Sequence, residues 1–132
     1  MTQMQQMAHP IDSLTQVVEK ERIPELQQLV RRIQVVDSVR RYILELVHAT
    51  RDNPALALGA SPRGSLALFR SAQALAVMRG RDFVIPDDVK HVAVPCLAHR
   101  LVLNPENTLG GETSQGVIEE LLRQIEVPLA ST

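Results

Sequence analysis

The stretch GASPRG, residues 59–64, decides how the rest of the chain is organised. It predicts the start of a helix, because Ser61 is a favourable N-cap residue and Pro62 suits the first helical position. Arg63 then falls in the first turn, where the helix dipole favours an anion over a cation by about 0.3–1 kcal/mol. A phosphate or carboxylate from outside would satisfy both the arginine and the free N–H groups. The alternative is an ordinary solvated arginine, and this stretch alone leaves both interpretations open.

The segment after this start is apolar almost all round, which is typical of a helix buried at the centre of a domain. We expect this helix to end at Gly80, because glycine readily adopts the left-handed conformation that follows many helices. Its apolar residues are Leu66, Ala67, Leu68, Phe69, Ala72, Ala74, Leu75, Ala76, Val77 and Met78.

Four further helices are expected around the central one. One begins near Pro24, and a second covers residues 38–52 with Asp37 as its N-cap. A third begins at Pro86, and Pro95 is expected to kink it or split it in two. The last begins near Thr113 or Ser114. The pattern therefore predicts an all-α fold, a small bundle of about five helices.

The connections between these helices are expected to be loops, at residues 55–60 and 104–111. A short β pairing between residues 83–85 and 101–103 is a weaker expectation. The chain has 132 residues, of which 45% are hydrophobic, which is enough for one domain with its own core. No internal repeat is visible.

Composition and absent motifs exclude several classes of function. The formal net charge is −1, so nothing suggests a nucleic-acid binder, and no apolar run has membrane-spanning length. A lone cysteine, Cys96, fits a reducing, cytoplasmic location. The sequence has no G-x-x-x-x-G-K-[ST] phosphate loop and no H-E-x-x-H pair, and its histidines are scattered, so no metal site is predicted. Asp87 and Asp88 are interpreted as first-turn carboxylates that favour the helix dipole.

Several longer strings resemble the MoxR branch of the AAA+ ATPases. They are GASPR (59–63) with SLAL (65–68), GRDFVIPDDV (80–89) and VAVPCLAHRL (92–101), preceded by HPID (9–12). The resemblance covers about residues 9–128. Two positions depart from it: Gly64 stands where the family often has alanine, and Ile85 stands where it often has threonine.

The resemblance implies a C-terminal helical lid over residues 12–130, with residues 1–11 as a tail or the trailing end of an absent ATPase core. In AAA+ proteins the arginine of this string is the sensor 2 residue, which reaches the terminal phosphates of ATP. Arg63 would then be the catalytic contact, and Ser61 and Pro62 would place it at the cofactor. ATP and Mg²⁺ would bind only with the core, so this chain alone is expected to be inactive and to bind no cofactor.

The resemblance also implies partners: the ATPase core, neighbouring subunits in a ring, and a von Willebrand factor A-domain protein, without nucleic acid or membrane. A rival hypothesis is a self-standing helical module for protein interaction or DNA-binding regulation. The arginines that could form a basic patch in that case are Arg31, Arg32, Arg40 and Arg41.

Overall fold

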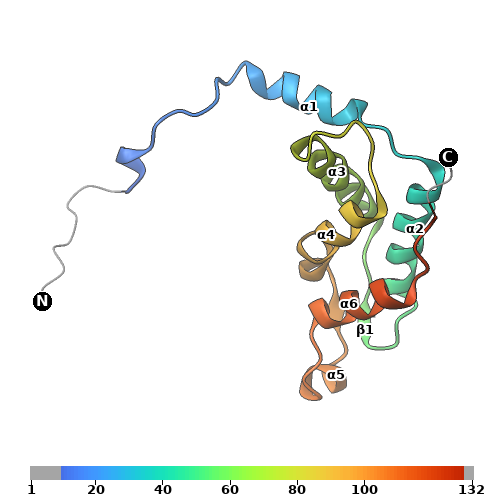
Figure 1. The fold of residues 1–132 in the computed structure, drawn as a ribbon. Helices are drawn as coiled ribbons and strands as arrows, with labels where there is room; N and C mark the ends of the chain where they lie inside the picture. The colour runs from blue at the N-terminus through green and yellow to red at the C-terminus, as the bar shows by residue number, and fades with distance from the viewer. Residues whose placement is uncertain (1–9, 130–132) are drawn as a thin grey trace, which may run out of the picture.

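The computed structural model describes residues 10–129, and it confirms a mostly helical fold with one small antiparallel strand pair (Figure 1). Residues 1–9 of the predicted tail, His9 included, lie outside the described residues. The elements in chain order are η1 (Pro10–Ser13), α1 (Arg22–Arg32), α2 (Asp37–Arg51), β1 (Leu56–Leu58), α3 (Pro62–Met78), α4 (Pro86–Leu97), η2 (Ala98–Arg100), β2 (Val102–Leu103), α5 (Pro105–Leu109) and α6 (Ser114–Gln124).

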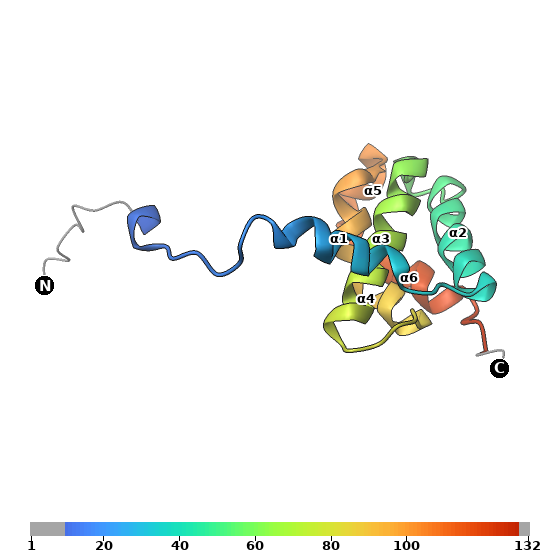
Figure 2. The ribbon, with the colours of Figure 1, turned by 90° about the horizontal axis from the view of Figure 1, so that it is seen from above.

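Helix α3 is the central element, as its apolar sequence predicts. It packs most extensively against α4 and also contacts α1 and α2 (Figure 2). Leu68, Ala72 and Ala76 on α3 are fully buried, and the two alanines let neighbouring helices approach closely. The other buried apolar residues come from the helices, strands and connecting segments around α3: Ile33, Val35, Val39, Tyr42, Ile43, Leu46, Val47, Leu56, Ala60, Val84, Val89, Ala93, Leu97, Leu101, Val117, Ile118 and Leu121.

The predicted strand pairing had the wrong partner. Strand β2 pairs with β1, in the register Leu56 with Leu103 and Leu58 with Val102, and so residues 55–60 are not simply a loop. The chain near Phe83 is instead held by the α1–α2 connection: the Gln34 N–H donates to the Asp82 carbonyl and the Gln34 carbonyl accepts from Val84, both at 2.9 Å. Both pairings join segments far apart in sequence, which local patterns do not reveal.

Three helix predictions also need correction. Helix α4 is not split at Pro95 but continues to Leu97, because a proline near the helix end removes only one backbone hydrogen bond. Residues 105–109, expected to be loop, form the short helix α5. The expected end of α3 is confirmed, since Gly80 has a φ of +71°. Helix α2 begins at Asp37 itself, with Val36 as its N-cap residue.

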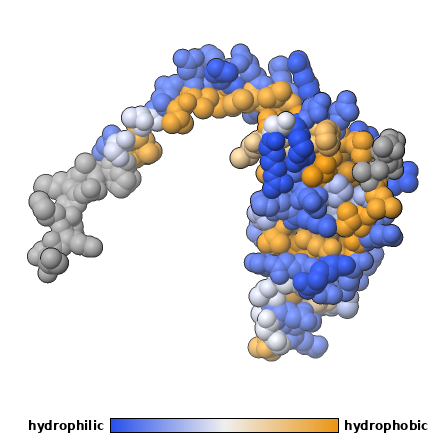
Figure 3. Space-filling view, viewed as in Figure 1, coloured by the Kyte–Doolittle hydropathy of each residue, from blue (hydrophilic) through white to orange (hydrophobic). Residues whose placement is uncertain are grey.

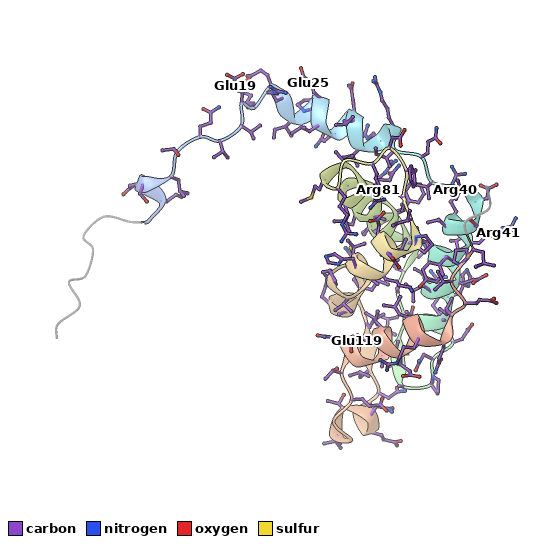
Figure 4. The ribbon with its side chains drawn as sticks, viewed as in Figure 1. Glu19, Glu25, Arg40, Arg41, Arg81 and Glu119 are labelled. Carbon is purple, nitrogen blue, oxygen red and sulfur yellow. The ribbon has the colours of Figure 1, made fainter. Side chains whose placement is uncertain are left out.

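The N-terminal arm, residues 10–32, leads away from the helical body (Figures 1 and 2). Helix α1 lies across α3, and the underside of the arm is apolar (Figure 3). Glu19 and Glu25 lie on the opposite, convex side (Figure 4). Leu26 and Leu29 on α1 remain 45% and 46% exposed, so the body covers only part of this apolar face. Within residues 10–129, every helix is too short or too polar to cross a bilayer.

Candidate functional site

The last turn of α2 holds the segment that precedes α3. The Thr50 hydroxyl accepts the Ala60 N–H at 2.9 Å, and Arg51 Nε donates to the Ala60 carbonyl at 2.7 Å. Thr50 is completely buried and donates its own proton to the Val47 carbonyl at 2.6 Å. Both backbone polar groups of Ala60 are therefore fixed by α2, which positions the start of α3. Thr50 falls on the buried, otherwise mostly apolar side of α2, so its position in the sequence does not reveal this contact.

Gly59 makes this docking sterically feasible. A Cβ atom at this position would lie 2.6 Å from the Thr50 carbonyl oxygen and 2.6 Å from Arg51 Cα. Such distances are far below van der Waals contact, and both atoms belong to the backbone of α2. The glycine is thus required because two backbones meet here.

The predicted start of α3 is confirmed, but the predicted side-chain cap is not formed. Ser61 is the N-cap residue with an extended backbone, and Pro62 is the first helical residue. The Ser61 hydroxyl makes no capping hydrogen bond. The backbone carbonyl of Ser61 instead accepts the Gly64 N–H at 2.8 Å. The N-terminus of α3 is therefore less satisfied by its own side chains than the sequence suggests.

Arg63 lies in the first turn of α3 with its side chain exposed. Within residues 10–129 it makes no hydrogen bond or ion pair. The next residue, Gly64, is buried, and a Cβ there would lie 3.2 Å from Ala60 Cβ and 3.3 Å from Leu97 Cδ2. Glycine at this position therefore lets α3 pack closely on the end of α4.

A shallow pocket lies at the start of α3, next to Ser61 and Pro62, and carries two arginines, Arg51 and Arg100. Arg100 comes from η2, and its Nε donates to the Cys96 carbonyl at 3.0 Å. Among the described residues no carboxylate lines this pocket, so its charge is positive although the chain has a formal net charge of −1. The lining residues are Arg51, Ala57, Leu58, Gly59, Ala60, Ser61, Pro62 and Arg100.

The opposite end of α3 carries a second charged cluster, which is neutralised internally. Asp88 is fully buried and accepts from Arg81 at 2.6 and 2.7 Å, from Arg79 at 3.0 Å and from the Ile85 N–H at 3.0 Å. Burial alone would raise the pKa of Asp88, but the hydrogen bonds from Arg81 and Ile85 and the two positive charges outweigh it and lower that pKa. The hydrogen bond from the Ile85 N–H to Asp88 also caps the start of α4, although the Ile85 side chain has no polar atom that could do so.

The arginines of the rival basic patch are only partly brought together. Arg31 and Arg40 line one hollow with Arg70, whereas Arg41 lines another beside Glu45. Arg40 is paired with Asp37 at 3.3 Å, and Arg70 donates to Gln73 at 2.9 Å. Figure 4 shows Arg40 and Arg41 on the outer part of α2. Among the described residues, no three His, Cys, Asp or Glu side chains gather as a metal site would need.

Comparison with known proteins identifies the relatives of this chain. A family model described as "AAA lid domain" matches residues 48–121, which is more than half of the chain. The protein YeaC of Bacillus subtilis is 40% identical over 126 residues, covering 96% of this chain and 39% of YeaC. The chaperone MoxR1 of Mycobacterium tuberculosis is 36% identical over 112 residues, covering 78% of this chain and 30% of MoxR1.

A solved structure is also similar to this chain in both fold and sequence. The crystal structure of a proposed ATPase from Cytophaga hutchinsonii superposes with a TM-score of 0.73 at 35% identity, over 77% of this chain and 34% of that protein. The chain thus spans between 30% and 39% of the length of these relatives. On the family match and on these similarities, the chain belongs to the AAA lid domain family and is homologous to MoxR-family chaperones over most of its length.

Proposed function

We propose that this chain is the lid of a MoxR-like AAA+ ATPase and that Arg63 is its sensor 2 residue. In this role Arg63 contacts the terminal phosphates of ATP and couples hydrolysis to movement of the lid. The observation that carries the proposal is the position of Arg63: it is exposed and unpaired within the described residues, in the first turn of α3. The helix dipole disfavours a cation there, and an external phosphate removes that cost.

The residues at this end of the lid fit a phosphate but not a complete nucleotide site. Arg63 offers a guanidinium, which binds phosphate oxygens in a bidentate way. The chain contains no phosphate loop, so the grip on the triphosphate and on Mg²⁺ must come from an AAA+ core. Bound ATP would supply the terminal phosphoryl group, which is transferred to water with ADP as the leaving group, and the protein would contribute positioning and stabilisation of charge.

The lid is suited to report nucleotide state because α3 is held rigidly within it. The Ala60 peptide is fixed to α2, and α3 is buried against α4, so a force on Arg63 moves the body as one unit. Contact with the terminal phosphate draws the lid toward the core, and its loss after hydrolysis releases it. The hinge lies within residues 9–23, of which residues 14–19 form no helix or strand.

The apolar underside of the arm supports association with an AAA+ core. Its exposed apolar residues extend beyond the reach of the helical body, which is the pattern of a surface covered by another domain (Figure 3). The exposed large apolar residues of the arm are Ile11, Leu14, Val17, Val18, Ile23, Leu26 and Leu29. Ring assembly, a chaperone role and a von Willebrand factor A-domain partner are further parts of this proposal, and they rest on the likeness to MoxR proteins.

The decisive experiment measures ATP hydrolysis in a polypeptide that joins this chain to its AAA+ core. We expect Arg63→Ala to lower kcat by about 10²-fold, the scale for losing one donor to developing charge. Its effect on the unfolding free energy of the lid should stay within about 0.5 kcal/mol, because the side chain is exposed and unpaired. Arg41→Ala is the matched control, since Arg41 is an exposed arginine on α2 away from the pocket. Unchanged turnover in the Arg63 variant would contradict the sensor role.

A second measurement uses this chain alone. Without a core to bind the triphosphate, its Kd for ATP should be weaker than micromolar. A micromolar Kd measured with this chain alone would contradict the proposal that the core supplies most of the ATP contacts. The rival function, DNA-binding regulation, predicts a retarded band with duplex DNA at physiological salt. The pairing of Arg40 with Asp37 and the net charge of −1 make that result unexpected.

A further inference from the structure

The pocket beside Arg63 contains two arginines that are oriented but not neutralised. Arg51 Nε donates to the Ala60 carbonyl at 2.7 Å, and Arg100 Nε donates to the Cys96 carbonyl at 3.0 Å. These bonds fix the plane of each guanidinium. The Nη groups of both side chains make no hydrogen bond or ion pair within residues 10–129, and no carboxylate lines the pocket.

Some arginines of the body are neutralised by carboxylates and others are not. Arg79 and Arg81 bind Asp88, Arg40 binds Asp37, and Arg123 binds Glu120, whereas Arg31, Arg32, Arg41 and Arg70 form no ion pair within residues 10–129. At the start of α3, Arg51 from the end of α2 and Arg100 from η2 line one pocket that has no carboxylate among the described residues, and Arg63 lies in the adjoining first turn of α3. The two guanidinium groups are held in fixed orientations beside one helix start, which suits an anion with several oxygen atoms.

Gly64 brings Arg100 to this place. A Cβ on Gly64 would lie 3.9 Å from Arg100 Cδ, so the stem of Arg100 runs alongside the first turn of α3. Arg51 reaches the same pocket from the opposite wall, where it holds Ala60. The same residues that position the start of α3 therefore also surround it with positive charge.

We propose that Arg51 and Arg100 bind phosphate groups of the nucleotide in this pocket, next to the phosphate that Arg63 contacts. This inference rests on the proposed function, because it extends the sensor contact to a second phosphate subsite. Arg100 serves mainly to hold the nucleotide. Arg51 has two roles, since it also positions Arg63 through the Ala60 carbonyl.

The first test titrates this chain with inorganic tripolyphosphate and follows its backbone amide resonances by NMR, with sodium chloride at matched ionic strength as the reference. We expect the amides of Gly59, Ala60 and Ser61 to shift with tripolyphosphate and not with chloride. Arg100→Gln should weaken the apparent affinity about fivefold, a loss equivalent to one charge-assisted contact. Arg40→Gln should leave it unchanged. Absent shifts, or equal affinity in the Arg100 variant, would overturn the proposal.

The second test separates this inference from the sensor role. In the polypeptide that carries the AAA+ core, Arg100→Gln should raise KM for ATP about fivefold with kcat within twofold, and Arg100→Lys should recover part of the loss. Arg63→Ala should act on kcat instead. If the Arg63 variant loses turnover while the Arg100 variant keeps a normal KM, the pocket proposal fails and the sensor role stands. If Arg63→Ala has no effect, the sensor role fails independently.

Arg51 needs a separate variant because its removal also loosens the start of α3. Arg51→Lys keeps the positive charge and loses the oriented donor to Ala60, whereas Arg51→Gln loses the charge. Each variant is first compared with the wild-type chain by its NMR spectrum outside residues 57–64. A pocket cation predicts weaker tripolyphosphate binding in the glutamine variant than in the lysine variant. Equal affinity in the two variants would remove Arg51 from the site.

Discussion

Replacing Asp88 by asparagine should cost this domain about 2–4 kcal/mol of unfolding free energy. The carboxylate has no solvent exposure and accepts four hydrogen bonds, two from Arg81, one from Arg79 and one from Ile85. Asparagine keeps the volume and one acceptor oxygen but loses the charge. Breaking a fully buried pair costs about 3–5 kcal/mol. Here the arginine side chains are 39% and 22% exposed, so water recovers part of that cost.

Urea unfolding followed by circular dichroism measures this loss directly. The matched control is Asp87→Asn, because Asp87 is the preceding residue, is 73% exposed and lies 3.8 Å from Lys90. That variant should lose less than about 0.5 kcal/mol. A loss of 2–4 kcal/mol in the Asp88 variant corresponds to a fall in Tm on the order of 10 °C. Equal losses in the two variants would refute the assignment of Asp88 as the buried anchor.

The pH dependence gives an independent check on the same residue. The pKa of Asp88 is lowered in the folded state, so its contribution is fully present above the unfolded-state pKa of about 4. As the pH falls below that value, the unfolded chain takes up a proton first and the contribution is lost. The stability difference between wild type and Asp88→Asn should therefore be constant near neutral pH and shrink below about pH 4. A difference that stays constant in acid would contradict the lowered pKa.

Two further substitutions test packing at α2. Gly59→Ala should destabilise the domain by about 1–3 kcal/mol, because the new Cβ would lie 2.6 Å from the Thr50 carbonyl oxygen. The control is Gly110→Ala, whose Cβ would lie 3.4 Å from its nearest neighbour. Equal losses of unfolding free energy in the two variants would refute the steric argument. Tyr42→Phe should leave the unfolding free energy unchanged or raise it by about 1 kcal/mol, because the buried Tyr42 hydroxyl has no hydrogen-bond partner within residues 10–129. A loss above about 1 kcal/mol would show that this hydroxyl is satisfied in solution.

Features that depend on neighbouring residues were predictable from the sequence. The start of α3 at Pro62, its end at Gly80 and the start of α6 after Thr113 all follow from capping preferences that act within one turn. The family resemblance rests on strings of the same kind, and it is confirmed by the match to AAA lid domains. The role of Arg63 stays a prediction, because its ligand is not part of the chain.

Features that depend on distant contacts were missed. The partner of β2 lies more than forty residues earlier in the chain, and nothing in the alanine-rich segment 55–58 marks it as a strand. Arg51 lies on the polar side of a regular amphipathic helix, so its pattern indicates only a solvated side chain. Its contact with Ala60 exists because Gly59 lets two backbones meet. An alanine–glycine segment directly before a helix start is the one signal that could have suggested close docking.

The two ends of α3 carry opposite arrangements of charge, and stability explains only one of them. A helix C-terminus favours cations, and there Arg79 and Arg81 are neutralised further by a buried carboxylate. A helix N-terminus disfavours cations, and there Arg63 lies in the first turn while Arg51 and Arg100 line the adjoining pocket, all three without an acidic partner in the described part of the chain. Folding alone would favour an aspartate or glutamate at this start. Unpaired positive charge at the less favourable end is therefore a cost to the folded lid. Under the proposed function an incoming phosphate removes that cost, and nucleotide binding and lid closure become a single energetic event.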